Sequence, residues 1–109
     1  LTHTAAGHPG FEFIARRDTF EALGGFGEEF IGWGKEDTCF MTVAATLAGI
    51  VWSRERSVHF WHPPASGGKR DKEHPTYLRN AELARMYAKC LGRPDAMRGL
   101  IEKRRGQCR

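Results

Sequence analysis

The sequence predicts an α/β domain in which a short mixed sheet is flanked by helices. Segments rich in aromatic and β-branched residues, at 11–16, 50–52 and 57–61, are typical of strands. Apolar residues recur at helical spacing over 36–48 and 76–91, which predicts two amphipathic helices. Because 40% of the 109 residues are apolar, the chain can build one small core and is too apolar to be disordered.

The N-terminal part is predicted to contain one strand and one short helix. In FEFIAR, residues 11–16, alternate side chains would point to opposite faces of a strand. Asp18 is the predicted N-cap of a helix of one or two turns, which Gly24 and Gly25 end. Residues 24–34 hold five glycines in eleven positions, so we predict a loop there.

A helix of three to four turns is predicted from Glu36, with Gly49 at its end. Its first turn carries Glu36 and Asp37, where the positive end of the helix dipole favours anions. Two short strands, IVW and SVHFW, are expected next, joined by the polar turn SRER and ended by Pro63 and Pro64.

The C-terminal part is predicted to be helical. Residues 76–91 form an amphipathic pattern that ends at Gly92, and this helix should lie on the outside of the sheet. Pro94 suits the first position of a last short helix. We therefore predict a main segment over 1–92, followed by a short helix and a basic tail over 93–109. The tail is expected to be a solvated end, although a basic tail can also touch nucleic acid.

The cysteines and the apolar runs indicate the environment of the chain. Cys39, Cys90 and Cys108 are widely spaced and form no CxxC pair, which favours reduced thiols and a cytoplasmic location. The longest apolar run, residues 40–52, is interrupted by polar residues and is shorter than the ~20 residues that a bilayer crossing needs. No transmembrane segment is predicted.

Gly32, Trp33 and Gly34 form the first candidate binding feature. Glycines on both sides let the backbone turn freely and leave both faces of the indole open. An apolar plate of this kind packs well against the C–H groups of a sugar ring. The alternative is that Trp33 folds back and anchors the loop to the core, and the stretch alone favours neither.

Glu36 and Asp37 form the second candidate feature. Adjacent residues at a helix start point about 100° apart, so the two carboxylates suit two separate roles rather than one paired acid–base role. One could hold a ligand hydroxyl and the other could accept its proton. The alternative is that one of them caps the helix.

HFWHP, residues 59–63, is the third candidate feature. On a strand, His59 and His62 would face opposite sides, so at most one of them could be a ligand of a shared site. His62, at the strand end, is better placed for a metal ion. Taken alone, it is more often an ordinary histidine.

Together these features resemble a known family. The run RRDTFEALGGFGEEFIGWGKED, followed by HFWHP, resembles the C-terminal half of a GT-A-type glycosyltransferase. It is similar to family 2 enzymes and to the galactosyltransferase C-terminal domain, whose pattern is GGF, a few acidic or aromatic residues, and then G-W-G-x-E-D opening a helix. The resemblance covers residues 10–65, and the rest of the chain matches only as a helical tail.

The resemblance implies a role for each matching position. Trp33 and Gly34 would bind the acceptor sugar, and Glu36 would bind acceptor hydroxyls. Asp37 would be the general base that deprotonates the acceptor in an inverting transfer. His62 would be a ligand of Mn²⁺ (or Mg²⁺), which steadies the nucleotide diphosphate as it leaves.

The sequence also departs from the family pattern. Lys35 stands where the galactosyltransferase pattern has glycine, and Thr38 stands where a third acid is common, which leaves the acceptor and the donor sugar open. The family's D-x-D motif, which belongs to a Rossmann-like nucleotide-binding half, does not occur in this sequence. The chain alone is therefore expected to be inactive.

Two functions follow as hypotheses. The first is the acceptor-binding and catalytic-base segment of an inverting, metal-dependent nucleotide-sugar glycosyltransferase. The alternative is a non-catalytic sugar-binding or partner-completing module derived from such an enzyme. In both cases the expected partners are a carbohydrate acceptor and, for the enzyme, a nucleotide-sugar donor. Self-association or pairing with a nucleotide-binding half is expected because half of a fold leaves an uncovered surface. Nucleic acid is not an expected partner.

Overall fold

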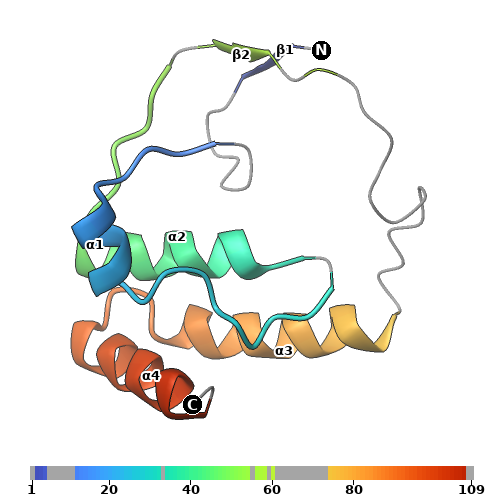
Figure 1. Cartoon of the computed structure of the whole chain (residues 1–109), viewed down its shortest axis with the longest axis vertical. Coiled ribbons are helices and arrows are strands. Elements are labelled where there is room, and N and C mark those ends of the chain that lie inside the picture. The colour runs from blue at the N-terminus through green and yellow to red at the C-terminus, as the bar shows by residue number, and fades with distance from the viewer. Residues whose placement is uncertain are drawn as a thin grey trace.

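The computed structural model describes residues 2–4, 12–32, 34–54, 56–58, 60 and 74–107. The elements along the chain are β1 (Thr2–Thr4), α1 (Arg17–Ala22), α2 (Glu36–Leu47), β2 (Arg56–Val58), α3 (Pro75–Lys89) and α4 (Pro94–Gln107). The four helices lie together, and the short strands lie apart from them (Figure 1).

The predicted fold class, an α/β domain with a short mixed sheet flanked by helices, is wrong. The described part of the chain is built from helices, and its only strands are β1 and β2, of three residues each. These two pair antiparallel, with Thr2 opposite Val58 and Thr4 opposite Arg56. No helix is packed on this pair in Figure 1, so the prediction that the helix over 76–91 covers a sheet is also wrong.

Two of the predicted strands, over 11–16 and 50–52, have no strand partner in the part of the chain that the structure describes. Residues 12–16 and 50–54 have no regular secondary structure. Ile14 and Val51 are almost fully exposed, which a half-buried strand would not allow. Of the predicted strand over 57–61, only its first two residues lie in β2. Alternating apolar residues indicate which side chains share a face, but a strand also needs backbone partners for its N–H and C=O groups.

The helices are close to their predicted positions. α2 begins at Glu36 and α3 begins at Pro75, where His74 Nδ1 accepts a hydrogen bond from the backbone N–H of Thr76 (3.3 Å). α1 begins one residue before Asp18, so Asp18 stands in the first turn and not at the N-cap. The last helix begins at Pro94 as predicted and continues to Gln107.

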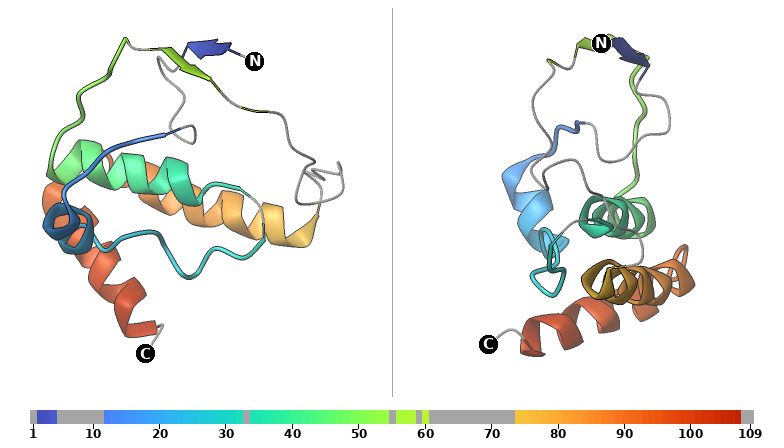
Figure 2. Two further views of the ribbon diagram at one scale, coloured as in Figure 1. Left: turned by 45° about the horizontal axis from the view of Figure 1, so that its top comes forward. Right: turned by 90° about the vertical axis from the view of Figure 1, so that its right-hand side faces the viewer.

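α2 and α3 run side by side in the same direction, and α4 packs beneath them (Figure 1, Figure 2). As a result, the N-terminal ends of α2 and α3 lie at the same end of the helix pair. The loop between α1 and α2 follows α3 along its length (Figure 1). This arrangement places the GWGKED motif beside the first turn of α3.

The core lies where α2, α3 and α4 meet. Its buried apolar side chains are Leu23, Cys39, Phe40, Val43, Ala44, Tyr87, Met97 and Ile101. Beside this core, the rings of Phe13, Phe20, Phe26 and Phe40 form a cluster with centroid separations of 5.0 to 6.4 Å. Such separations are typical of favourable aromatic pairs. The segment before α1 is thus held by its aromatic side chain rather than by strand pairing.

Candidate functional site

The candidate site lies where the α1–α2 loop enters α2. Gly34 has a φ of 107° and Lys35 a φ of 80°, both in the left-handed region. A Cβ atom on Gly34 would lie 3.0 Å from the ring of Tyr77 in α3. Glycine is therefore required at position 34 for two reasons, the backbone conformation and the close approach of Tyr77.

α3 holds the loop that leads into this turn. The side chain of Asn80 is fully buried, accepts a hydrogen bond from Ile31 N (3.3 Å) and donates one to Ile31 O (2.8 Å). Arg79 Nη1 donates to the backbone carbonyl of Glu29 (2.7 Å). These bonds satisfy backbone groups that a loop over a helix would otherwise leave without partners. They also fix Ile31, the residue directly before the motif.

Tyr77 forms one wall beside the motif. Its ring lies against Gly34, and the Lys35 Nζ atom lies 5.9 Å from the ring centroid, within the range of a cation–π interaction. Thr76, the preceding residue, lies close to Gly32. The amphipathic pattern of α3 gave no reason to select Tyr77, because its ring packs on a loop instead of the core.

The two carboxylates of the motif have different surroundings. Asp37 Oδ1 accepts hydrogen bonds from Thr38 N (2.6 Å) and Thr38 Oγ1 (3.3 Å). The Glu36 Oε2 atom is buried and has no hydrogen-bond partner among the described residues. The N-cap residue of α2 is Lys35, and no side chain caps the helix there. Neither Glu36 nor Asp37 stands at the N-cap, but Asp37 does accept a hydrogen bond from a backbone N–H in the first turn, so a structural role of this carboxylate stays open beside the functional one.

Two predicted site residues, Trp33 and His62, lie outside the described residues. Of HFWHP, only Phe60 is described, and its side chain is exposed. Among the residues that the structure does describe, no group of three or more His, Cys, Asp or Glu side chains could hold a metal ion. The described side chains therefore do not provide a donor set that fits Mn²⁺ or Mg²⁺.

The structure reveals a buried polar group that sequence reasoning missed. Glu29, Tyr87 and Arg104 come from the loop, α3 and α4, and we call them the polar clamp. The Tyr87 hydroxyl donates to Glu29 Oε1 (2.6 Å), and Arg104 Nη1 donates to the Tyr87 hydroxyl oxygen (2.9 Å). Arg104 Nη2 donates to the Gly24 carbonyl (2.6 Å), and Arg104 Nε lies 3.7 Å from Glu29 Oε2.

Arg104 was expected in a solvated basic tail, but its exposure is only 8%. Residue type does not distinguish buried Arg104 from its neighbours Lys103 and Arg105, because all three side chains are cationic. The only signal is that Arg104 falls three residues after Ile101 and seven after Met97, on the buried face of α4.

Burial also shifts the pKa of two groups, the Tyr87 hydroxyl within the polar clamp and the Cys39 thiol, which senses the charge of Glu29. Burial raises the pKa of the Cys39 thiol from 9.0 to about 12, and the nearby Glu29 carboxylate adds to the effect. The pKa of Tyr87 is raised by burial and by its hydrogen bond to Glu29. Both groups are therefore neutral at physiological pH, and neither is a candidate nucleophile.

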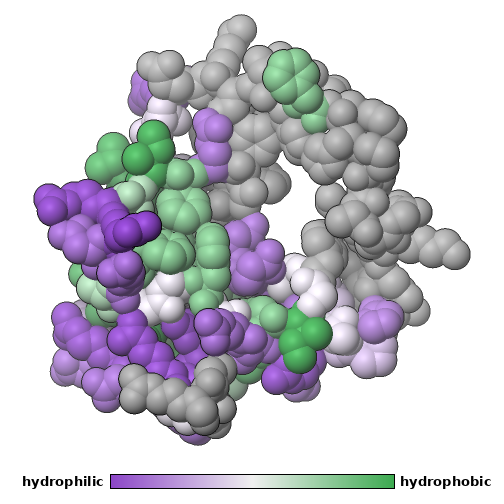
Figure 3. All heavy atoms as spheres, viewed as in Figure 1, coloured by the Kyte–Doolittle hydropathy of each residue, from purple (hydrophilic) through white to green (hydrophobic). Residues whose placement is uncertain are grey.

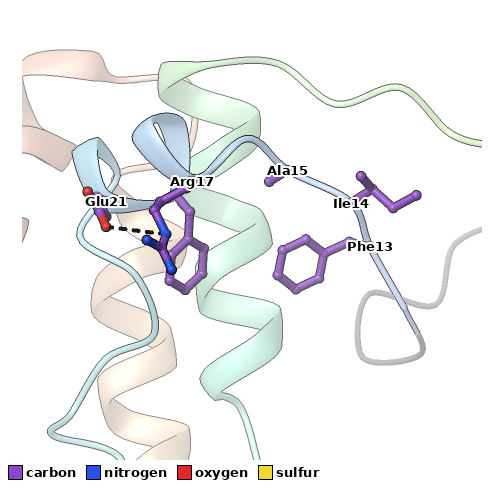
Figure 4. Close-up of a pocket in the computed structure, with 6 residues that line it drawn as sticks. Phe13, Ile14, Ala15, Arg17 and Glu21 are labelled. Carbon is purple, nitrogen blue, oxygen red and sulfur yellow. Dashed lines mark ion pairs between the residues drawn. The ribbon is translucent and has the colours of Figure 1, made fainter.

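An open hollow lies in front of α1. Its lining residues are Phe13, Ile14, Ala15, Arg17, Phe20 and Glu21, and an Arg17–Glu21 ion pair of 4.0 Å closes one side (Figure 4). Figure 3 shows apolar side chains gathered over this region, with charged ones around them. None of the described residues of GWGKED lines the hollow, so the hollow is separate from that part of the candidate site.

No protein-family model, curated protein or solved structure matches the chain. None of the helices in the described ranges combines the length and the apolar character that a membrane crossing needs.

Proposed function

We propose that this chain is the acceptor-binding and catalytic-base segment of an inverting, metal-dependent nucleotide-sugar glycosyltransferase. The observation that carries the proposal is the buried Glu36 Oε2 atom, which finds no hydrogen-bond donor among the described residues. Two described atoms are of this kind, Glu29 Oε2 and Glu36 Oε2, but Glu29 Oε2 faces Arg104 Nε at 3.7 Å, whereas Glu36 has no ion-pair partner among the described residues. A buried carboxylate oxygen without a donor is costly, and a bound ligand is one way to satisfy it. A sugar hydroxyl would supply the missing donor.

Asp37 is proposed as the general base. Thr38 binds its Oδ1 atom through a backbone N–H and a hydroxyl, which orients the carboxylate. Among the described residues, no hydrogen bond engages the other oxygen, Oδ2. In the proposed reaction, this oxygen takes the proton of the acceptor hydroxyl. The hydroxyl oxygen then bonds to the anomeric carbon as the bond from that carbon to the nucleotide diphosphate breaks, which inverts the anomeric centre.

The acceptor would be held by groups around this turn. Trp33, Gly34 and Glu36 are proposed to bind the acceptor sugar, with Glu36 accepting a hydrogen bond from one of its hydroxyls. His62 is the ligand that this chain would contribute to Mn²⁺ or Mg²⁺. The nucleotide-sugar-binding half would have to supply the other metal ligands, because the described residues provide no group of three or more side chains that could hold a metal ion. The free thiols Cys39 and Cys90 support the cytoplasmic location that we propose.

A carbohydrate-binding experiment tests the acceptor role. The chain is applied to a glycan array, and Kd is measured by titration for the glycan that binds best. Glu36→Gln should raise this Kd about tenfold because the amide is a poorer acceptor than the carboxylate. Asp37→Asn should leave the Kd nearly unchanged. Glu28→Gln, an exposed position of the same loop, is the matched control. If the unaltered chain binds no glycan on the array, the acceptor role is contradicted.

The second candidate is a non-catalytic sugar-binding module. It is favoured by the absence of a D-x-D motif from the sequence. The two candidates differ in whether Asp37 matters once a nucleotide-sugar-binding half is present. In the enzyme that joins both halves, Asp37→Asn should abolish transfer while donor binding persists. Transfer that survives this change would contradict the base role and favour the binding module.

A further inference from the structure

The polar clamp fixes two points of the loop that carries the candidate site. Arg104 Nη2 binds the Gly24 carbonyl at the start of the loop, and its Nε atom faces the carboxylate of Glu29 in the middle. Tyr87 bridges Glu29 and Arg104 through its hydroxyl. Arg104 and Tyr87 are buried, and the Glu29 side chain is 13% exposed, so the group is largely shielded from water.

The loop sequence is fitted to this clamp. A Cβ atom on Gly24, where φ is 89°, would lie 2.5 Å from Arg104 Nη2 and 3.0 Å from a side-chain carbon of Ile101. A Cβ atom on Gly27 would lie 2.6 Å from Glu29 Oε2. Real Cβ atoms do not approach other atoms so closely. Gly24 and Gly27 therefore leave room for the two charged side chains that hold the loop.

The chemistry of the clamp favours a role in geometry over one in stability. Replacing a buried ion pair by apolar side chains of similar size is often neutral or stabilising, because burial of the charges is costly. Hydrogen bonds, in contrast, fix distances and directions. The polar clamp fixes the positions of Gly24 and Glu29 although this requires the burial of charged groups. Asn80 fixes the loop further along, at Ile31. The next residues along the loop belong to the motif.

We infer that Glu29, Tyr87 and Arg104 are positioning residues for the acceptor site, and that α4 is thereby a part of that site's scaffold. This inference rests on the proposed function. None of the three residues needs to touch the acceptor. They act through the loop, by setting the place of the turn at Gly34 relative to Glu36 and Asp37.

Tyr87→Phe is the sharpest test because it removes only the hydroxyl and keeps the buried ring. We expect amide hydrogen exchange over residues 28–36 to rise about tenfold while exchange in the middle of α2 changes little. The Kd for the best-binding array glycan should rise about tenfold. Met97→Ala is the matched control: it weakens the packing of α4 at a fully buried position outside the clamp. It should lower the melting temperature without the selective change over 28–36.

Arg104→Lys provides a second variant that keeps the charge. A lysine ammonium keeps the charge but cannot bind the Gly24 carbonyl and the Tyr87 hydroxyl with the fixed geometry of a guanidinium. Both the amide exchange over residues 28–36 and the glycan Kd should therefore be intermediate between the values for Tyr87→Phe and for the unaltered chain. Equal exchange profiles for Tyr87→Phe and Met97→Ala would overturn the inference, as would an unchanged glycan Kd in Tyr87→Phe. If the loop loses protection selectively but the unaltered chain binds no glycan, the clamp is supported and the proposed function is contradicted.

Discussion

Lys35 adopts a backbone conformation that residues with a Cβ atom rarely visit. Its φ of 80° places it in the left-handed region, at a cost of about 1 kcal/mol. The ring of Tyr77 lies 5.9 Å from its ammonium group, and an exposed cation–π contact returns about 0.5 kcal/mol.

Lys35→Gly should therefore stabilise the chain. Relief of the left-handed strain outweighs loss of the cation–π contact, so the free energy of unfolding should rise by about 0.5 kcal/mol. Thermal unfolding followed by circular dichroism measures this change. Lys35→Ala is the control because it loses the contact and keeps the strain, and it should destabilise by a similar amount. A lower melting temperature for Lys35→Gly than for Lys35→Ala would show that the left-handed backbone at position 35 does not destabilise the chain.

The buried thiol of Cys39 makes the free energy of unfolding fall as the pH becomes alkaline. The folded pKa of its thiol is about 12 and the ordinary value is 9.0, so the folded state keeps a proton that the unfolded state loses. Its contribution is fully present below pH 9 and is lost as the pH rises towards 12. The raised pKa of Tyr87 acts in the same direction at higher pH.

Between pH 8 and pH 10, the free energy of unfolding should fall by about 1.4 kcal/mol on account of Cys39. Urea titrations at the two pH values measure the fall. Cys39→Ala is less stable throughout but lacks this titration, so its fall should be smaller by that amount. Equal falls in the two proteins would show that the thiol is not buried in a neutral form.

At the scale of the elements, the loop between α1 and α2 depends on α3 for its shape. Its described residues, 23–32 and 34–35, have no regular secondary structure. Asn80 provides its central attachment through both backbone groups of Ile31. A loop held in this way is ordered by side chains of a neighbouring helix. The attachment can be removed without changing any residue of the loop.

Asn80→Asp should lower the free energy of unfolding by about 3 kcal/mol. Aspartate cannot donate to Ile31 O, and it would bring a charge to a fully buried position. Chemical denaturation measures the loss. Arg79→Ala removes the neighbouring, exposed hydrogen bond to the loop and should cost less than 1 kcal/mol. Similar losses in the two variants would argue against Asn80 as the central attachment.

The helices could be predicted from the sequence and the sheet could not. Helical hydrogen bonds form within one segment, so the apolar spacing from Phe40 to Leu47 and the glycine after it determine α2 almost alone. Strands depend on partners elsewhere in the chain, and neither Phe13 nor Val51 finds one. Around the candidate site, the motif predicts roles for Glu36 and Asp37, which stay predictions. Tyr77 and Asn80 carry no local signal because the loop residues that they contact are 43 and 49 positions away. Arg104 carries only the weak signal of its spacing from Met97 and Ile101.

At the scale of the whole molecule, α4 is part of the one core. Met97 and Ile101 are buried in it, and Arg104 reaches the first loop. The four helices therefore stabilise one another, and the segment over 1–92 lacks part of its own interior. This bears directly on the predicted division of the chain after residue 92.

A chain that ends at Gly92 should lose cooperative unfolding. Removal of α4 exposes the core beside Tyr87 and leaves Glu29 without its buried cation, which together exceed the marginal stability of a small domain. Calorimetry of this chain and of one that ends at Gln107 makes the comparison. A sharp transition at a similar temperature in the shorter chain would instead support 1–92 as an independent unit.

The bond between Arg104 and Gly24 joins residues that are 80 positions apart, and this separation has a consequence for biosynthesis. A ribosome adds about 5 to 20 residues per second, so residue 104 is made about 4 to 16 s after residue 24. During that time the α1–α2 loop has been translated but cannot take its final place. The Gly24 carbonyl and the Glu29 carboxylate gain their Arg104 partner only after most of the chain has been made, so the loop completes its attachments last.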